Sequence, residues 1–248
     1  MIKFFRKIRY DLLEKNKTGK YLKYAIGEII LVVIGILLAL QINTWNTERI
    51  SDKKMITYLD NLKDDLKSDT LAFSHRINFY KDFLENKKKL LSLSHFENIP
   101  TDSLENIFFP TYGNYEINTT TFTKISNLGI SEISKNDNLS RKIYEYYTSK
   151  LKYFNSFINW EIEQTHNEAN YWFNNQDEYE LSNFFEFPQF QDVNTNRQNL
   201  IKLISNPKGR NYLISDYERK QRVLSVYQDI KKRADSLILG IENELINK

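Results

Sequence analysis

The chain has 248 residues, of which 35 are Lys or Arg and 32 are Asp or Glu, and its formal net charge is +3. It contains no cysteine, which excludes disulfide bonds, a thiol nucleophile, a zinc–thiolate cluster and a lipoprotein anchor. Only seven glycines and four prolines are present, too few for a turn-rich β fold, so the composition predicts an all-α protein.

A basic segment, residues 1–23, opens the chain and carries eight basic and two acidic residues, a net charge of +6. Ile2, Phe5, Ile8 and Leu12 recur at helical spacing among these charges, which is typical of an amphipathic helix on an anionic inner leaflet. A basic tail that serves only as a topology signal explains the same charges, so both interpretations stay open. We expect no nucleic-acid partner, because the apolar segment that follows accounts for the charge.

Residues 24–45 form the one stretch that is apolar enough to cross a bilayer, and their number is close to the ~20 residues that a transmembrane helix needs. A signal-peptide cleavage site after Ala39 is disfavoured because Leu37 stands where a small residue is required. We therefore predict an uncleaved signal anchor. The positive-inside rule places the N-terminus in the cytoplasm and residues 46–248 outside, in the periplasm of a double-membrane bacterium.

Several residues of this segment are candidates for a specific role: Gly27, Glu28, Gly35, Ala39, Gln41 and Trp45. Glu28 is an ionisable residue inside a membrane span, although it is shallow enough to reach the interface. Gly35 and Ala39 form a small-xxx-small pair that lets two helices approach closely, so we predict self-association, although such pairs also occur by chance. Gln41 either hydrogen-bonds across such an interface or marks the outer boundary, and Trp45 is placed as an interfacial aromatic residue.

The N-terminal sequence also carries a resemblance. Residues 1–9 read MIKFFRKIR and residues 24–46 read YAIGEIILVVIGILLALQINTWN. They resemble a family of short single-pass membrane proteins of unknown function from Bacteroidota, with the signature IKFFRKIR…YAIGEIxLVVIGILxALQINxWN; Thr44 stands where the family often has Asn. A looser similarity covers residues 122–147. The resemblance implies an inner-membrane protein and supplies no activity.

Residues 46–248 are predicted to form one extracytoplasmic helical domain. Apolar residues recur at steps of three and four over about 48–93, about 137–174 and from Pro207 onward, which predicts three long helices. Shorter helices are predicted after Pro100, before Gly129 and over about 195–205, with an irregular stretch at 110–121 and an acidic, Phe-rich loop at 175–194. Three long helices of this kind predict an elongated antiparallel bundle with coiled-coil-like packing, and the first helix is expected to continue from the span.

The sequence contains no G-x-S-x-G, phosphate-binding loop, dinucleotide fingerprint or H-E-x-x-H, so we predict no enzyme, no catalytic residue and no cofactor. Glu163-x-x-His166, with Glu161 and Glu168 nearby, resembles half of a di-iron site, but the second copy that such bundles need is missing. We therefore predict no metal site and assign this helix face to solvent. The basic clusters at 87–89, 219–222 and 231–233 are assigned to solvent in the same way.

Aromatic residues crowd the second long helix and cannot all lie on one stripe. Most are predicted to lie in a thick core, and Trp160 and Trp172 are candidates for an exposed partner-binding patch, because Tyr and Trp are frequent hot-spot residues. Two classes of function fit the sequence. One is a membrane-anchored interaction or scaffold protein, oligomeric and bound to another envelope protein; the other is a sensory or signal-relay protein with a helical input domain, coupled through Glu28 to a separate cytoplasmic partner.

Overall fold

A computed structural model of the chain describes Tyr10, residues 18–181 and residues 188–246. These residues form helices and loops without a strand, which confirms the predicted all-α class. The amphipathic helix or basic tail expected near the N-terminus lies almost entirely outside the described residues. Contacts divide the chain into two compact units, Met1–Thr57 and Tyr58–Lys248.

Helix α2 (Thr18–Leu91) contributes to both units. No glycine or proline interrupts residues 36–91, so nothing in the local chemistry ends the helix between the apolar segment and the first long amphipathic stretch. The predicted continuation of one into the other is therefore confirmed.

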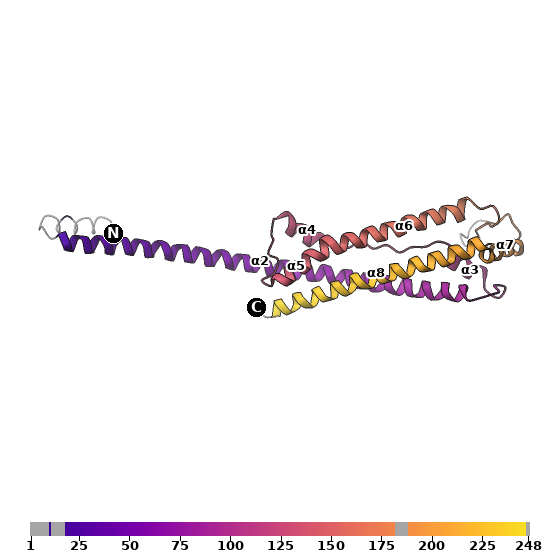
Figure 1. Ribbon diagram of the computed structural model, residues 1–248, viewed down its shortest axis with the longest axis horizontal. Coiled ribbons are helices and arrows are strands. Elements are labelled where there is room, and N and C mark those ends of the chain that lie inside the picture. The colour runs from indigo at the N-terminus through magenta and orange to yellow at the C-terminus, as the bar shows by residue number, and fades with distance from the viewer. Residues whose placement is uncertain (1–9, 11–17, 182–187, 247–248) are drawn as a thin grey trace. The chain divides into compact units, whose positions relative to one another are not determined.

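The second unit is a bundle of three long helical stretches (Figure 1). They are α2 from Tyr58 onward, the stretch over residues 137–174, and α8 (Pro207–Ile246). The middle stretch consists of α5 (Asp137–Glu145), a π-helical turn η1 (Tyr146–Lys150) and α6 (Leu151–Asn174). The Asn136 side chain caps its start by accepting from the N–H groups of Asn138 and Leu139.

Helix α8 is antiparallel to both α2 and α6, as predicted, whereas α2 and α6 run parallel to each other. The contacts that set these directions are Lys67–Glu242 and Lys87–Asp216 between α2 and α8, and Phe154–Tyr227 and Glu168–Arg219 between α6 and α8. A parallel pair requires the intervening chain to return along the bundle.

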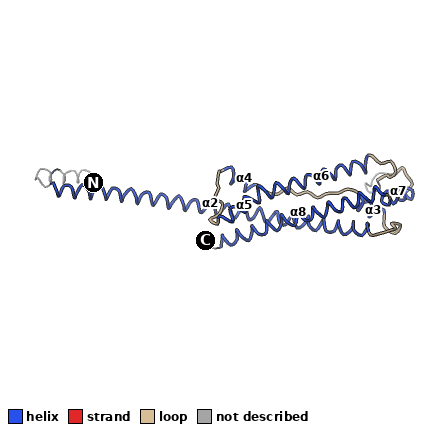
Figure 2. The backbone as a smooth tube through the Cα atoms, in the orientation of Figure 1, coloured by secondary structure: helices blue, strands red, loops and turns tan. Residues whose placement is uncertain are grey.

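Residues 110–119, here called the strap, make part of this return as an extended loop (Figure 2). The Tyr80 hydroxyl donates to the Gly113 carbonyl at 2.9 Å and accepts from the Gly113 N–H at 3.0 Å. Asp69 accepts from the Tyr115 hydroxyl at 2.8 Å and from the Asn118 N–H at 3.1 Å. Strap residues thus meet α2 in reverse order, and the chain returns to the end of the bundle where α5 begins.

The shorter helices are α3 (Thr101–Phe108), α4 (Thr120–Asn127) and α7 (Val193–Ser205). Gly129 follows α4 at φ 67°, a left-handed conformation that suits glycine. Helix α7 begins two residues earlier than predicted because the Asp192 side chain accepts from the Thr195 N–H and caps it at that point. Part of the predicted loop at 175–194, residues 182–187, lies outside the description.

Buried side chains line the bundle from one end to the other. Leu59, Leu62 and Leu66 are fully buried, so this stripe packs within its own chain and is not free to extend a contact between copies. At the other end, α3, α7 and the start of α8 close a second cluster, which contains Leu90, Phe96, Leu104, Phe108, Phe109, Trp172, Tyr179, Leu200, Leu203, Ile204, Tyr212 and Leu213.

Candidate functional site

The apolar segment of α2 is exposed, in contrast to the buried apolar stripe of the bundle. Its large hydrophobic side chains from Ile26 to Ile42 are 47–65% exposed, and no part of its most apolar window, with a mean hydropathy of 2.6, is buried. By length and composition it belongs to the one helix among the described residues that can cross a membrane. Such continuous apolar exposure is not found on ordinary soluble domains.

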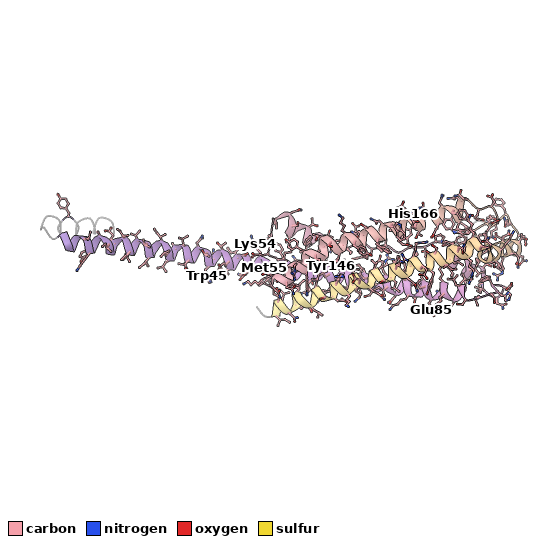
Figure 3. All side chains as sticks on the ribbon, in the orientation of Figure 1. Trp45, Lys54, Met55, Glu85, Tyr146 and His166 are labelled. Carbon is pink, nitrogen blue, oxygen red and sulfur yellow. The ribbon has the colours of Figure 1, made fainter. Side chains whose placement is uncertain are left out.

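The six candidate residues of this segment lie on the exposed helix. Glu28 is half-buried, while Gly27, Gly35, Ala39 and Gln41 are exposed. A Cβ atom added at Gly35 would meet nothing within 4 Å, so the surface beside it is open. Trp45 is 63% exposed, with the Arg49 guanidinium 5.8 Å from its ring centroid (Figure 3).

The prediction that Trp160 and Trp172 lie in one exposed patch is wrong for Trp172. Trp160 is 41% exposed, but Trp172 is only 3% exposed because it packs against Phe108 in the core. Trp160 instead continues a row of aromatic side chains along the outside of α6. Its ring centroid lies 5.6 Å from that of Phe157, which lies 6.4 Å from that of the exposed Tyr153. Tyr153 and Trp160 are exposed and Phe157 between them is half-buried; these three residues are called the exposed aromatic face.

The assignment of charged residues to solvent is wrong for the residues that open two of the basic clusters, Lys87 and the pair Arg219 and Lys220, because they meet acidic residues inside the bundle. The buried charge cluster consists of three cations and three carboxylates, namely Lys87, Arg219, Lys220, Glu161, Glu168 and Asp216. Four of the six are at most 1% exposed. Their positive and negative formal charges cancel, which is the condition under which charges are tolerated in a protein interior.

Helix α8 supplies three of the six residues of the buried charge cluster. Arg219 and Lys220 follow Asp216 by three and four residues, so both lie on the same side of the helix as Asp216. The Lys87 ammonium contacts the Asp216 carboxylate, and Lys220 Nζ lies 2.5 Å from Glu161. Burial lowers the pKa of Lys87, and the neighbouring charge of Asp216 opposes that shift.

Arg219 joins the three carboxylates of the cluster. Its guanidinium lies 2.5 Å from Glu168, 3.1 Å from Asp216 and 3.2 Å from Glu161, so its planar donors are shared between α6 and α8. Burial raises the pKa of Glu168, and its hydrogen bond from Arg219 works in the opposite direction.

The acidic residues and the histidine of the Glu163-x-x-His166 region do not face a common point, because their partners lie in different directions. Glu161 is directed to Lys220 and Arg219, whereas the His166 ring Nε2 lies 3.0 Å from the Tyr112 hydroxyl on the strap. Glu163 and His166 are both exposed, and His166 is labelled in Figure 3. Over residues 18–181 and 188–246, no three His, Asp or Glu side chains come together as metal ligands would.

A second polar cluster lies where the strap and η1 meet α2. Asp69 is fully buried, and burial raises its pKa from 3.8 to about 6, against the hydrogen bonds from Asn118 and Tyr115. Its other carboxylate oxygen, Oδ2, and the hydroxyls of Tyr146 and Tyr147 have no hydrogen-bond partner in the described part of the chain. The nearby Asp69 also contributes to raising the pKa of both hydroxyls, after burial itself.

The described elements define a class of protein: an all-helical bundle whose first long helix also carries an apolar segment of membrane-spanning length. Residues 28–187 match a family of unknown function (DUF6090). The match covers more than half of the chain, so the protein belongs to this family, and the predicted relation to a family of unknown function is confirmed at that level. Comparison with curated proteins and with solved structures found no match.

Proposed function

We propose that the protein is a single-pass protein of the bacterial inner membrane whose helical domain holds or recruits another protein of the cell envelope. The observation that supports the membrane anchor is the exposure of residues 26–42, since lipid is the environment in which such a surface is stable. The net charge of +6 over residues 1–23 supports a cytoplasmic N-terminus and a periplasmic bundle. The N-terminal signature adds an origin in Bacteroidota to the proposal.

The exposed aromatic face supports the binding role. Tyr153, Phe157 and Trp160 form a row of adjacent rings on one helix, and aromatic side chains of this kind anchor many protein interfaces. Their position on α6 lies within the family match. We propose no catalytic activity for this surface.

A signal-relay role is the second candidate, and one observation favours it. Glu28, in the apolar segment, and the charged residue Lys87, in the bundle, lie on the same uninterrupted helix α2. A helix of this kind transmits a rotation or shift only if a cytoplasmic partner reads it, so this role requires such a partner.

Topology is tested with two C-terminal fusions to the full chain. A phosphatase that is active only outside the cytoplasm is expected to be active after Lys248, and a fluorescent protein that folds only in the cytoplasm is expected to stay dark. The reverse pair of results would overturn the orientation. A mature chain whose N-terminal sequence begins near Gln41 would overturn the anchor.

Partner binding is tested in native membranes with a photo-crosslinking amino acid at Trp160 and, as the matched control, at the exposed Glu163 one turn away. The proposal expects a crosslinked protein of defined mass from position 160 that the double variant Tyr153→Ser/Phe157→Ser removes. Equal crosslinking from both positions, or yields that this variant leaves unchanged, would reject the aromatic face as the binding surface. The signal-relay role would be rejected if Glu28→Gln changes neither the crosslinking at position 160 nor the crosslinking of the protein to any cytoplasmic partner.

A further inference from the structure

A cavity of about 550 Å³ opens between α2, α3, the start of the strap and the end of α6. Its size lies within the range of small-molecule sites, roughly 300–1,000 Å³. It belongs wholly to the second unit, and neither the apolar segment nor the exposed aromatic face contributes to it. A role for this cavity is therefore independent of the proposed function.

Four phenylalanine rings form much of its wall. Phe79 and Phe83 stack along α2 with centroids 6.3 Å apart, and Phe109 and Phe173 lie 5.3 Å apart on the opposing elements. Such rings offer an apolar surface with a negative electrostatic face. They suit a ligand with an apolar body, a positive charge, or both.

The charged residues of the lining have one sign. Asp82 and Glu105 are carboxylic acids, and the described residues around the cavity include no Lys, Arg or His. Glu105, on α3, is 1% exposed, and Asp82, on α2, is exposed. Lys87 Nζ lies 4.6 Å from the Phe83 centroid, but Lys87 is not part of the lining and its charge is matched by Asp216.

We propose that this cavity binds a small organic cation, an ammonium group carried on an apolar body. Carboxylates with aromatic faces attract such a cation twice, through charge and through the ring quadrupoles. An anion is disfavoured by the same charges. A bare metal ion is disfavoured because no three His, Asp or Glu side chains of the described residues come together as metal ligands would, here or elsewhere.

The test measures binding to the full-length protein in a non-ionic detergent by calorimetry, with empty micelles as the blank. Benzyltrimethylammonium is the main probe, and choline is compared with 3,3-dimethylbutanol, which has nearly the same shape without the charge. Saturable binding of benzyltrimethylammonium is expected, with choline bound about tenfold more tightly than its neutral counterpart. Absence of saturable binding, or equal affinity for choline and dimethylbutanol, would overturn the proposal.

Variants locate the site. Asp82→Asn and Phe83→Leu are each expected to weaken benzyltrimethylammonium binding by about threefold to tenfold. Glu85→Gln is the matched control, because Glu85 is an exposed carboxylate on the same helix that pairs with Lys89 and does not line the cavity (Figure 3). Asp82 is exposed, so its variant tests the site even if Phe83→Leu fails to fold. Equal weakening by Asp82→Asn and Glu85→Gln would show only general charge attraction and reject the cavity.

Discussion

Asp69 is a carboxyl group in a position that the helix pattern would give to an apolar residue. It lies on α2 between Leu66 and Phe73, both fully buried, and it holds the strap through Tyr115 and Asn118. Its raised pKa, about 6, means that the folded protein binds a proton more tightly than the unfolded chain does. The carboxylate therefore fixes the strap at some cost in stability at neutral pH.

This cost predicts a pH effect with a definite sign. Between the ordinary pKa of 3.8 and the raised value of about 6 the folded state holds more protons, so the Asp69 contribution to stability falls as the pH rises through 6. Asp69→Asn removes this titration, and we expect it to raise the free energy of unfolding at pH 7.5 by about 1–2 kcal/mol after allowance for solvent screening. Urea unfolding of the full chain in detergent at pH 5 and 7.5 measures the difference.

The control for this prediction is Asp64→Asn, an exposed carboxylate on the same helix. We expect it to leave the pH dependence of the wild-type protein intact. If Asp69→Asn lowers stability at pH 7.5 and keeps the wild-type slope, then the hydrogen bonds of Asp69 outweigh its burial and the interpretation is wrong.

At position 209 only glycine fits, because the backbone of α7 passes too close for a side chain. A Cβ atom at this position would lie 1.9 Å from the Leu203 carbonyl oxygen, where the end of α7 meets the first turn of α8. Because that oxygen belongs to the backbone, the two helices must separate to admit a methyl group. We expect Gly209→Ala to lower the free energy of unfolding by at least about 1–3 kcal/mol, as measured by urea unfolding.

Gly240→Ala is the matched control in the same helix. Its added Cβ atom would meet the end of the flexible Leu139 side chain at 2.9 Å, which can move, and alanine is the better helix former. We expect this variant to be close to neutral. A loss of stability as large as that of Gly209→Ala would show that α8 tolerates no added volume anywhere, and the local explanation would fail.

At the scale of elements, periodicity predicted the three long helices, while it failed at the residues that break the apolar pattern. Lys87 stands three residues after Leu84 and three before Leu90, within the buried stripe of α2. Asp216 and Lys220 stand in the same way on α8. A charged residue at a position of the apolar stripe could have indicated burial. The sequence does not show, however, that another helix supplies the opposite charge that makes this burial tolerable.

The π-helical turn and the parallel direction of α2 and α6 could not be predicted from the sequence. The π-turn η1 leaves the apolar spacing around it almost unchanged, so the pattern gives no sign of it. The parallel arrangement of α2 and α6 depends on the path of the strap, which follows from contacts such as that of Tyr80 with Gly113. Local preferences predict that the strap is irregular, and only long-range contacts determine where it runs.

The buried charge cluster predicts an asymmetric pair of variants. Asp216→Leu leaves the buried Lys87 ammonium without its carboxylate partner, so we expect a loss of about 3–5 kcal/mol in unfolding free energy. Lys87→Met is expected to cost less, because Arg219 and Lys220 still lie 3.1 Å and 3.6 Å from Asp216. The double variant is expected to be more stable than Asp216→Leu alone. Urea unfolding of the four proteins in detergent measures the cycle.

Lys88→Met is the control for the cycle, since Lys88 is the exposed neighbour of Lys87 and its loss is expected to change stability by less than about 0.5 kcal/mol. If the two cluster substitutions simply add, then Lys87 and Asp216 do not depend on each other in the folded protein. That result would show that the pairing of Lys87 with Asp216 does not stabilise the bundle.

At the scale of the whole molecule, the two units predict separate folding. The core residues of the bundle all lie in residues 58–248, and the apolar window of the first unit buries nothing. We expect a chain of residues 58–248 to be helical by circular dichroism and to unfold cooperatively in urea, with a midpoint close to that of the full chain. A broad transition without a baseline would show that the bundle needs the first unit.

Association between copies is the remaining prediction for the whole chain, and the structure narrows where it can occur. The Leu59, Leu62 and Leu66 stripe is buried within the bundle, so of the two contacts predicted from the sequence only that of the apolar segment is left. Gly35 has open space beside it, and with Ala39 it permits close helix approach. We therefore expect Gly35→Leu to abolish most crosslinking between copies in native membranes, while Val33→Leu, the matched control, changes little. Equal crosslinking yields from wild type and Gly35→Leu would show that the apolar segment does not mediate association. Glu28→Gln would then be the remaining test of a specific role for this segment.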